Sequence, residues 1–486
     1  MNSPPGSLRH RAKRALVWSG AGNYGSGVLH LLALLGLGWL LPPTDFGLLA
    51  LALIAITLEE GIGDLGLPAA LIQRQEIDRT VLDSAFLCNL AVYLLLAAAT
   101  FFYSDALTGL LGDSNAAPLL RLLCLSLIIT GFSAVPRALL TRRLDFRRIS
   151  MAQFAGEIGF AGAGLTLAAL GFGALALGGA VLAQRLLICA VVWRSVDYRP
   201  GLSLDLRVLR HLVKFGAPVM ASNVVERVLL RADYFVIGRF VGTEPLGYYS
   251  LALQLSLVPL QRLAGLVRVV AFPTFSIVQK DATRIKNGLL EGMRGLLTVV
   301  LPAVILVVVS GPWLLRALYG EKWEPSVEPL RILGLAGLFL LPRLLEAAFM
   351  AVGKPRLLLQ FSLLRLIVFA ALVWTVGIGY GISGVAACVV GALAVWAGAY
   401  LVVGIRLFAI PWASLGGALW PTTRSGVLAL APLLLLVFVS TATISPWMVL
   451  AYTGISVTAI YLALTLPRYW GQLRRWLSLA TSARGS

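Results

Sequence analysis

The stretch AGNYGSGVLHLLALLGLGWLLPPTDFGLLALAL, residues 21–53, decides the fold class of this chain. Its first 21 residues contain no Asp, Glu, Lys or Arg, and an α-helix of about that length crosses a bilayer. The prolines Pro42 and Pro43 then interrupt the apolar run before a second run starts. The stretch therefore predicts two membrane-spanning helices joined by a short turn.

The same apolar pattern continues through the whole chain. Of the 486 residues, 59% are hydrophobic and 13% are charged, whereas soluble domains are roughly 45–50% apolar and about 25% charged. Apolar segments long enough to span a bilayer occur fourteen times, at 15–41, 45–67, 82–103, 117–136, 149–171, 174–193, 215–241, 245–272, 289–311, 327–350, 355–379, 381–405, 426–444 and 446–466. We therefore expect an all-α polytopic membrane protein with about 14 transmembrane helices.

The basic residues are sorted between the predicted loops. With the N-terminus placed in the cytoplasm, 28 of the 40 Lys and Arg residues fall in inner segments and only Arg316 and Lys322 fall in outer ones. Such a bias predicts that both termini are cytoplasmic. A net charge of +18 would indicate nucleic-acid binding in a soluble protein. Here the sorting explains the charge by membrane orientation, and we expect no nucleic-acid partner.

Residues 21–53 have a counterpart 200 residues later. An ungapped alignment with 221–253 gives 9 identities in 33 positions. Leu and Ala match by chance in apolar spans, so the informative matches are Asn23 with Asn223, Gly38 with Gly238 and Gly47 with Gly247. Because both segments start on the predicted inner side, the repeat is parallel. It predicts two pseudo-symmetric six-helix lobes around a central cavity.

The repeat divides the chain into four parts. They are an N-terminal lobe at 1–196, a cytoplasmic linker at 197–214, a C-terminal lobe at 215–405, and the last two helices with a basic cytoplasmic tail at 406–486. Apolar and basic residues alternate at 204–211. This pattern fits a short helix on the inner membrane surface and fits an irregular basic loop equally well.

Several predicted spans carry polar side chains that are costly in lipid. A charge in mid-membrane costs ~2.5–3.5 kcal/mol on insertion scales, so such residues usually face protein or water. The first span places Ser19, Asn23, Ser26 and His30 within about 60° of one another. We interpret His30 as a hydrogen-bonded interior residue, with a proton relay as the alternative.

The seventh and eighth spans are the most polar. The seventh carries Asn223, Glu226, Arg227, Arg231 and Asp233, and the eighth places Ser250, Gln254, Gln261 and Arg268 on one face. The charges of the seventh span either pair within the helix or line a substrate cavity. Pro259 in the middle of the eighth span predicts a kink.

Three acids, Glu59, Glu60 and Asp64, stand at the end of the second span. Burial raises the affinity of a carboxylate for protons, so they could bind a coupling proton or cation. Alternatively, they lie at headgroup level and only define the helix end. The glycines Gly61 and Gly63 loosen this turn, and both readings stay open.

The chain contains no recognisable catalytic or cofactor motif. It lacks the phosphate-binding loop of ATP-driven pumps. The four cysteines, Cys88, Cys124, Cys189 and Cys388, lie in apolar runs and have no metal-ligand spacing. We therefore expect no catalytic residues, metal or cofactor, and a protein that is not an enzyme.

Four short segments resemble a known family. They are LLPPTDFGLLA at 40–50, DLGLPAALIQR at 64–74, DYFVIGR at 233–239 and LGYYS at 246–250. They resemble the Wzx-like oligosaccharide flippases of the polysaccharide transport family. That family belongs to the multidrug/oligosaccharidyl-lipid/polysaccharide exporter superfamily and is related to multidrug and toxin extruders. The fourteen-span length agrees with it.

The resemblance implies a flippase for undecaprenyl-diphosphate-linked oligosaccharide in the bacterial inner membrane. It would serve the synthesis of lipopolysaccharide O-antigen, capsule or exopolysaccharide, by alternating access coupled to an ion gradient. Its partners would be the lipid-linked substrate, the bilayer, polysaccharide polymerase and glycosyltransferases. The residues expected to bind the pyrophosphate and sugar are Arg227, Arg231, Arg268, Asn23, Asn223, Gln254 and Gln261. The candidates for ion coupling are Glu59, Glu60, Asp64, Glu157, Glu226 and Asp233.

Two other functions compete with this reading. A drug extruder of the same fold would favour acids and aromatics in its cavity, whereas the seventh and eighth spans hold arginines. An O-antigen polymerase or ligase would carry a sizeable outer loop, and the longest outer loop predicted here covers only about 312–327.

Overall fold

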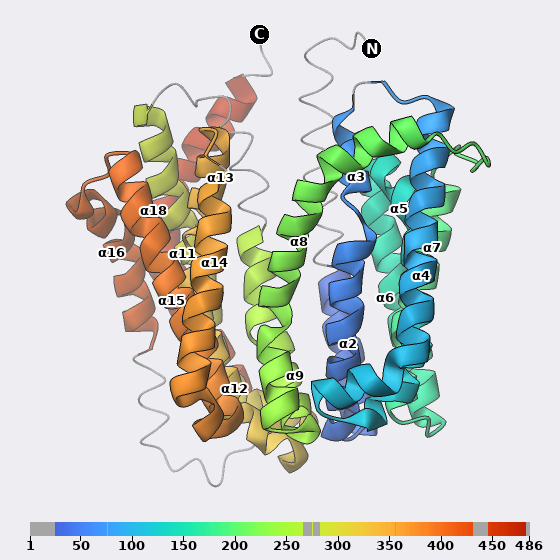
Figure 1. The fold of residues 1–486 in the computed structure, drawn as a ribbon. Coiled ribbons are helices and arrows are strands. Elements are labelled where there is room, and N and C mark those ends of the chain that lie inside the picture. Colours follow the sequence, from blue (N-terminus) through green and yellow to red (C-terminus); the bar gives the residue numbers. More distant parts are fainter. Residues whose placement is uncertain are drawn as a thin grey trace. The chain divides into compact units, whose positions relative to one another are not determined.

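The computed structural model describes residues 25–74, 76–265, 275, 282–354, 356–430 and 446–482. Within these ranges the chain is built from helices and contains no strand (Figure 1). Eight helical segments in this part of the chain are long and apolar enough to cross a membrane, and Gly25–Leu40 forms a shorter apolar helix. The prediction of an all-α polytopic membrane protein is therefore confirmed.

The chain folds as two compact units. Unit 1 contains Met1–Leu251 and Ala370–Cys388, and unit 2 contains Ala252–Phe369 and Val389–Ser486. The lobe boundaries expected at 196 and 215 remain a prediction.

Unit 1 contains the helices that position the candidate site. After the helix Gly25–Leu40 they are α2 (Pro43–Gly63), α3 (Leu67–Gln73), α4 (Arg79–Leu111), α5 (Ala117–Arg142), α6 (Phe146–Ala169), α7 (Ala174–Arg194), α8 (Leu206–Phe240) and the start of α9 (Thr243–Leu255). Proline suits a first helical turn because the missing N–H has no partner there, and α2 begins at Pro43. Asp78 caps α4 by accepting from the Val81 N–H at 2.8 Å.

A glycine turn separates α2 from α3. The left-handed Gly66, at φ 66°, lies against the backbone of Gly216 in α8, and a Cβ on either glycine would overlap the other segment's backbone. Only glycine has no steric cost in this conformation and at this close approach. The turn therefore ends α2 beside its acidic residues and brings α8 against it.

The predicted linker helix is present and is continuous with the seventh span. Residues 197–205 are not helical, and α8 then runs unbroken through 35 residues from Leu206. Asp205 caps it by accepting from the N–H groups of Arg207 and Val208. Figure 1 shows α8 as a bent helix, and it contains Pro218, a residue that breaks the hydrogen-bond ladder of a helix. Of the stretch 204–211, residues 206–211 are therefore helical and 204–205 are not, and the position of this helix on the inner membrane surface stays a prediction.

The repeat-related glycines of unit 1 form a reciprocal contact. A Cβ on Gly47 would overlap the carbonyl oxygen of Thr243, and a Cβ on Gly247 would overlap that of Pro43. Positions 43 and 243 are themselves related by the 200-residue shift. The two contacts are thus equivalent under the repeat, as a two-fold interface requires. This geometry agrees with the predicted parallel repeat.

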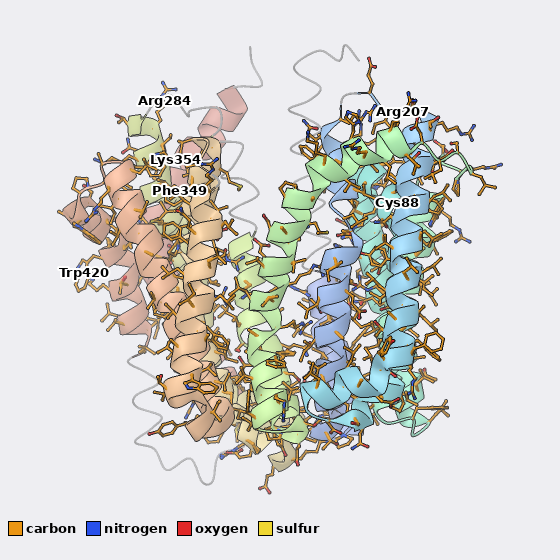
Figure 2. The ribbon with its side chains drawn as sticks, viewed as in Figure 1. Cys88, Arg207, Arg284, Phe349, Lys354 and Trp420 are labelled. Atoms are coloured by element: carbon orange, nitrogen blue, oxygen red, sulfur yellow. The ribbon has the colours of Figure 1, made fainter. Side chains whose placement is uncertain are left out.

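Unit 2 is also helical in the residues that the structure describes. After the last turn of α9, its elements are α11 (Ala282–Tyr319), η2 (Glu321–Ser326), α12 (Val327–Leu335), η3 (Ala336–Leu340), α13 (Arg343–Ala351), α14 (Arg356–Leu372), α15 (Gly381–Leu407), α16 (Trp412–Ala429) and α18 (Pro446–Ser482), with the last residues of α14 and the first residues of α15 in unit 1. Its core includes Phe349, which stacks on Tyr400 with ring centroids 5.6 Å apart. Figure 2 shows Arg284 and Lys354 at the same end of this unit.

Prolines and polar residues shift three of the predicted spans. The eighth span is interrupted at Ser256, because Pro259 cannot donate to the carbonyl four residues earlier. The tenth, expected at 327–350, is divided into α12, η3 and α13, with Pro342 before α13. Residues 412–425 were expected in a loop but are helical in α16. There Thr423 and Ser425 donate to carbonyls one turn back, which keeps polar side chains compatible with a helix.

Candidate functional site

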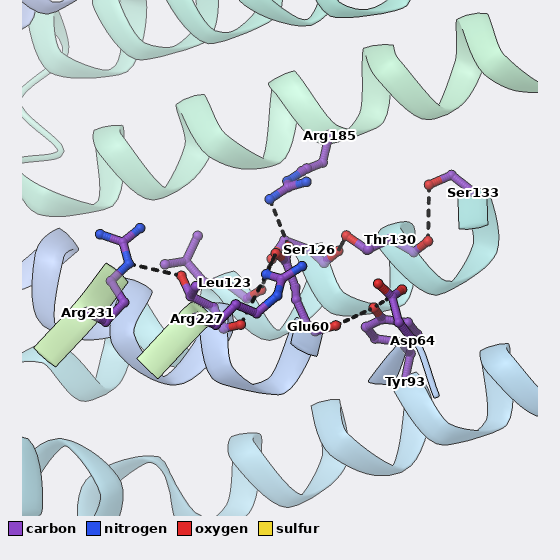
Figure 3. Close-up of polar contacts among 11 residues, drawn as sticks. Glu60, Asp64, Tyr93, Leu123, Ser126, Thr130, Ser133, Arg185, Arg227 and Arg231 are labelled. Atoms are coloured by element: carbon purple, nitrogen blue, oxygen red, sulfur yellow. Dashed lines mark hydrogen bonds and ion pairs between the residues drawn. The ribbon is translucent and has the colours of Figure 1, made fainter. Parts of the chain in front are cut away.

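A charged cluster lies within unit 1, centred on Glu60 of α2. Glu60 is buried, with 8% of the residue exposed. Arg185 of α7 donates from Nη2 to Glu60 Oε1 at 2.8 Å, and Arg227 of α8 donates from Nη1 to Glu60 Oε2 at 3.0 Å (Figure 3). Two guanidinium groups from different helices therefore share one carboxylate.

The cluster extends one helical turn back along α2 to Thr57. Arg227 Nη1 also donates to the Thr57 carbonyl oxygen at 3.2 Å, and Arg231 Nε donates to Thr57 Oγ1 at 3.2 Å. We call Thr57, Glu60, Arg185, Arg227 and Arg231 the Glu60 cluster. Because Arg227 and Arg231 are four residues apart on α8, both reach the same face of α2.

Gly61 makes room for the arginine that crosses α2. A Cβ on Gly61 would lie 2.7 Å from Arg227 Cδ and 3.5 Å from a Val224 methyl group. Real side chains essentially never approach so closely, and the Arg227 stem would have to move. The glycine noted in the sequence as loosening the turn therefore also lets α8 approach α2.

The end of α2 is held by residues of α4. Tyr93 donates its hydroxyl to Asp64 Oδ1 at 3.0 Å and to the Glu60 carbonyl oxygen at 3.2 Å. Asn89 Nδ2 donates to the Gly63 carbonyl oxygen at 3.1 Å. The last carbonyls of a helix have no partner inside the helix. These bonds satisfy two of them and fix the position of Glu60.

The charges of this region do not balance. Arg137 of α5 is exposed and interacts electrostatically with Glu60, Asp64 and Arg185. Counting it and Arg231, which binds Thr57 in the same cluster, four arginines lie around the three acids Glu59, Glu60 and Asp64, so the region has a formal charge of +1 when all seven are ionised. Arginine presents five N–H donors in a planar fork that matches phosphate oxygens. The arrangement is therefore suited to binding an anion such as a phosphate.

Of the seven residues predicted to bind substrate, the structure brings only some together. Arg227 and Arg231 lie in the Glu60 cluster, and Asn223 is half-buried one turn before Arg227 on α8. Asn23 and Arg268 lie outside the described residues. Gln254 and Gln261 belong to unit 2. That all seven residues line one cavity stays a prediction.

The acids predicted for ion coupling have different surroundings. Glu59 accepts from the Thr100 hydroxyl of α4, while its buried Oε2 has no hydrogen-bond partner. Glu157 of α6 lies with Oε2 3.0 Å from His30 Nδ1. The remaining acids are on α8: Asp233 accepts from the Tyr249 hydroxyl at 2.7 Å, and Glu226 is exposed. Arg227 thus pairs across to α2 rather than along its own helix.

Sequence reasoning missed Thr57, Tyr93, Arg137 and Arg185 as parts of this region. Arg137 was counted in an inner loop, but α5 continues to Arg142. Ser126, Thr130 and Ser133 precede it on α5 (Figure 3), at intervals that put all four on one helix face. This spacing is a signal that could have been found. Thr57 and Tyr93 have no such signal, because single residues of these types are common in apolar helices.

A second buried network anchors the linker before α8. Asp83 of α4 is 3% exposed and accepts from the Tyr198 hydroxyl at 2.8 Å, the Gly201 N–H at 3.0 Å and the Ser203 hydroxyl at 2.9 Å. Burial, together with the hydrogen bond to Asp83, raises the pKa of the Tyr198 phenol above its ordinary value. The linker is therefore attached to α4 of unit 1.

Among the described residues, no group of three or more His, Cys, Asp or Glu could hold a metal ion. The charged residues at the site are instead arginines and carboxylates in direct contact. The chemistry that this arrangement supports is ionic recognition, and no nucleophile is placed beside a base in it.

The chain is similar to known proteins in sequence and in fold. Residues 37–328 match the family described as polysaccharide biosynthesis protein. The chain is 27% identical over 338 residues to the lipopolysaccharide biosynthesis protein WzxC of Escherichia coli, covering 68% of each chain. It is 28% identical over 374 residues to the succinoglycan biosynthesis transport protein ExoT of Rhizobium meliloti, covering 76% of this chain and 74% of ExoT.

Solved structures share the fold at lower identity. The lipid II flippase MurJ in an inward closed conformation aligns with a TM-score of 0.78 and 15% identity, covering 94% of this chain and 100% of MurJ. An inward-facing multidrug transporter of the MATE family aligns with a TM-score of 0.64 and 16% identity, covering 79% of this chain and 94% of the transporter. At these identities the likeness concerns the fold alone.

Proposed function

The chain belongs to the polysaccharide biosynthesis protein family, and we propose that it is a flippase for undecaprenyl-diphosphate-linked oligosaccharide. It would carry the saccharide from the cytoplasmic to the outer leaflet of a bacterial inner membrane, for lipopolysaccharide O-antigen, capsule or exopolysaccharide synthesis. Relatives named for lipopolysaccharide biosynthesis and succinoglycan transport support the cargo class. The fold shared with MurJ supports a transporter rather than an enzyme.

The observation that carries this proposal is the Glu60 cluster. Its three arginines use only some of their N–H groups on α2, and a guanidinium group has five N–H donors with which to bind further anionic oxygens. A pyrophosphate offers several anionic oxygens that bind guanidinium groups in a bidentate manner. A substrate without a phosphate would leave this excess positive charge unpaired, which disfavours the cationic cargo of a drug extruder.

In this mechanism the substrate competes with Glu60 for its arginines. Removing the only anion beside a buried guanidinium is costly, but replacing one anion with another is not. The pyrophosphate would therefore take over Arg185 and Arg227 as Glu60 releases them. Because α2, α7 and α8 each contribute to the cluster, this exchange would loosen one set of helix contacts and permit alternating access.

Energy for the cycle would come from an ion gradient acting on buried acids of unit 1. Glu59 has a buried oxygen without a partner, and Glu157 faces His30. Both could take up a proton without displacing an arginine. Glu60, which holds two arginines, would instead respond to substrate.

The location and partners complete the proposal. The 28 basic residues in predicted inner segments support cytoplasmic termini. The product would be passed to a polysaccharide polymerase at the outer surface, and the glycosyltransferases that build the saccharide would act on the inner surface.

A deletion strain tests the proposal in cells. Without the protein, lipid-linked oligosaccharide should accumulate in the cytoplasmic leaflet, out of reach of reagents that label only the outer surface of spheroplasts. Plasmid-borne wild-type protein should restore labelling. If the deletion strain shows normal outer-leaflet labelling but only unpolymerised units, the protein is a polymerase and the proposal fails.

A further inference from the structure

A large apolar groove crosses the surface of unit 1, away from the Glu60 cluster. Its volume is about 920 Å³, near the upper end of the roughly 300–1,000 Å³ typical of small-molecule sites. α4 and α5 form one wall, and the loop between α6 and α7 with its flanking helix ends forms the other. Exposed apolar side chains line it, including Leu94, Phe101, Phe102, Leu125 and Phe172.

A single charged residue, Arg121, lies among the groove's lining residues. Arg121 forms an ion pair with Asp105 of α4, in which the side chains are 38% and 66% exposed. Asp105 is six residues before the end of α4, and Arg121 is four residues after the start of α5. At 1.5 Å per residue, both lie about 6–9 Å from the helix ends, a depth close to the lipid headgroups.

The apolar part of the groove extends from this ion pair toward the bilayer centre. Leu94 precedes Asp105 by eleven residues on α4, which places it about 16 Å deeper. Arg121 thus lines the groove at headgroup depth, its partner Asp105 lies beside the groove and outside its lining, and the apolar body lies at the depth of the acyl chains. This is the polarity profile of one phospholipid molecule.

We propose that the groove binds a phospholipid with a primary ammonium headgroup, phosphatidylethanolamine, in the leaflet next to the α4–α5 turn. The lipid phosphate would accept from the Arg121 guanidinium, and its ammonium group would donate to the Asp105 carboxylate. The acyl chains would cover the exposed phenylalanines. The groove shares no residue with the Glu60 cluster, and binding of this lipid is independent of what the protein transports.

Charge complementarity selects this headgroup over the others in a membrane. The ion pair has no net charge, so a purely anionic headgroup that approaches Arg121 also meets the Asp105 carboxylate. A choline headgroup has the same charges as ethanolamine but no N–H to donate. A headgroup with adjacent phosphate and N–H donors satisfies both partners, and hydrogen bonds between charged groups are the strong ones. Phosphatidylserine has both groups but adds a carboxylate that would meet the Asp105 carboxylate, which leaves ethanolamine as the matching headgroup.

Native mass spectrometry of the purified full-length protein tests the assignment. The protein would be titrated with dioleoyl forms of phosphatidylethanolamine, phosphatidylcholine and phosphatidylglycerol. We expect phosphatidylethanolamine to bind roughly tenfold more tightly than the other two, as the gain of one charged hydrogen bond implies. In Asp105→Asn this preference should vanish. In Glu324→Gln, which removes a comparable exposed ion pair with Arg316, it should persist.

A variant that blocks the groove with a large side chain provides a second test of lipid binding. Ala98 and Ala99 are neighbours on α4 and both are exposed, but only Ala98 lines the groove. Ala98→Trp should lose the tightly bound lipid, and Ala99→Trp should keep it. Equal binding of the three lipids by wild-type protein would overturn the proposal, as would preferential binding of phosphatidylglycerol or of an added isoprenyl phosphate. So would unchanged phosphatidylethanolamine binding by Ala98→Trp.

Discussion

Glu60 joins three helices of unit 1, α2, α7 and α8, through two ion pairs. Its carboxylate is the anion to which Arg185 and Arg227 are bound, at 2.8 and 3.0 Å. The side chains of Arg185 and Arg227 are only 32% and 26% exposed, so water replaces a lost partner incompletely. Removing the Glu60 carboxylate would leave two partly buried arginines without their anion, and this loss determines the cost in stability.

Glu60→Gln should therefore destabilise the protein by about 1–3 kcal/mol, the usual cost of leaving a buried polar group without its partner. The measurement is the thermal unfolding midpoint of purified protein in detergent. Glu324→Gln is the matched control, because the Arg316–Glu324 pair is 47% and 44% exposed and exposed pairs contribute only about 0–1 kcal/mol. Equal shifts in the two variants would show that Glu60 is not the anchor described here.

At this scale, sequence reasoning identified charges but not their partners. Glu60, Arg227 and Arg231 stood out because charged residues in apolar spans are costly. Their pairing depends on which helices are neighbours, and periodicity within a helix carries no such information. Thr57 in the cluster and Tyr93 beside it occupy positions that look ordinary in the sequence.

Glycines allow helices of unit 1 to approach closely at two places along α2, its end and its start. Gly61 and Gly66 allow α8 to approach the end of α2, and Gly47 and Gly247 allow the starts of α2 and α9 to interlock. The second contact is reciprocal between positions that the internal repeat relates. Symmetry of this kind makes a definite prediction, since equivalent positions should respond equally to the same change.

Gly47→Ala and Gly247→Ala should each destabilise the protein, and by similar amounts. The added methyl group would overlap a backbone carbonyl in either case, and overpacking of this kind costs about 1–3 kcal/mol. The thermal unfolding midpoint again measures the effect. Gly398→Ala in α15, where a Cβ meets nothing within 4 Å, should be neutral or stabilising. A destabilisation at only one of the two positions would contradict the reciprocal contact.

Most helices could be predicted from hydropathy alone, and the exceptions have local causes. The long helices α4, α5, α6 and α7 contain the spans expected for them, apart from residues at their ends. Hydropathy missed the start of α16, because Thr422, Thr423 and Ser425 lower the mean hydropathy of this segment. In the helix, the Thr422 side chain is buried, and the hydroxyls of Thr423 and Ser425 donate to backbone carbonyls one turn back. Hydropathy also missed the division at Pro342, since proline changes the backbone without changing the apolar character.

At the scale of the whole molecule, the basic excess has two parts. Most Lys and Arg residues lie in predicted inner segments, where they indicate the orientation of the chain in the membrane. A few lie inside the helices, and three of these form the Glu60 cluster. The net charge of +18 therefore says little about partners, whereas the few arginines inside the helices support an anionic cargo.

The most direct test of the central claim measures translocation by the purified protein. Proteoliposomes would contain undecaprenyl-diphosphate-linked oligosaccharide in both leaflets, and an added glycosidase would report the fraction that reaches the outside. With wild-type protein that fraction should rise toward completion. With Arg227→Gln/Arg231→Gln it should stay at the value of protein-free vesicles, while Arg239→Gln, an exposed arginine on the same helix, should behave as wild type. No translocation by the wild-type protein, or equal translocation by the double variant, would contradict the account.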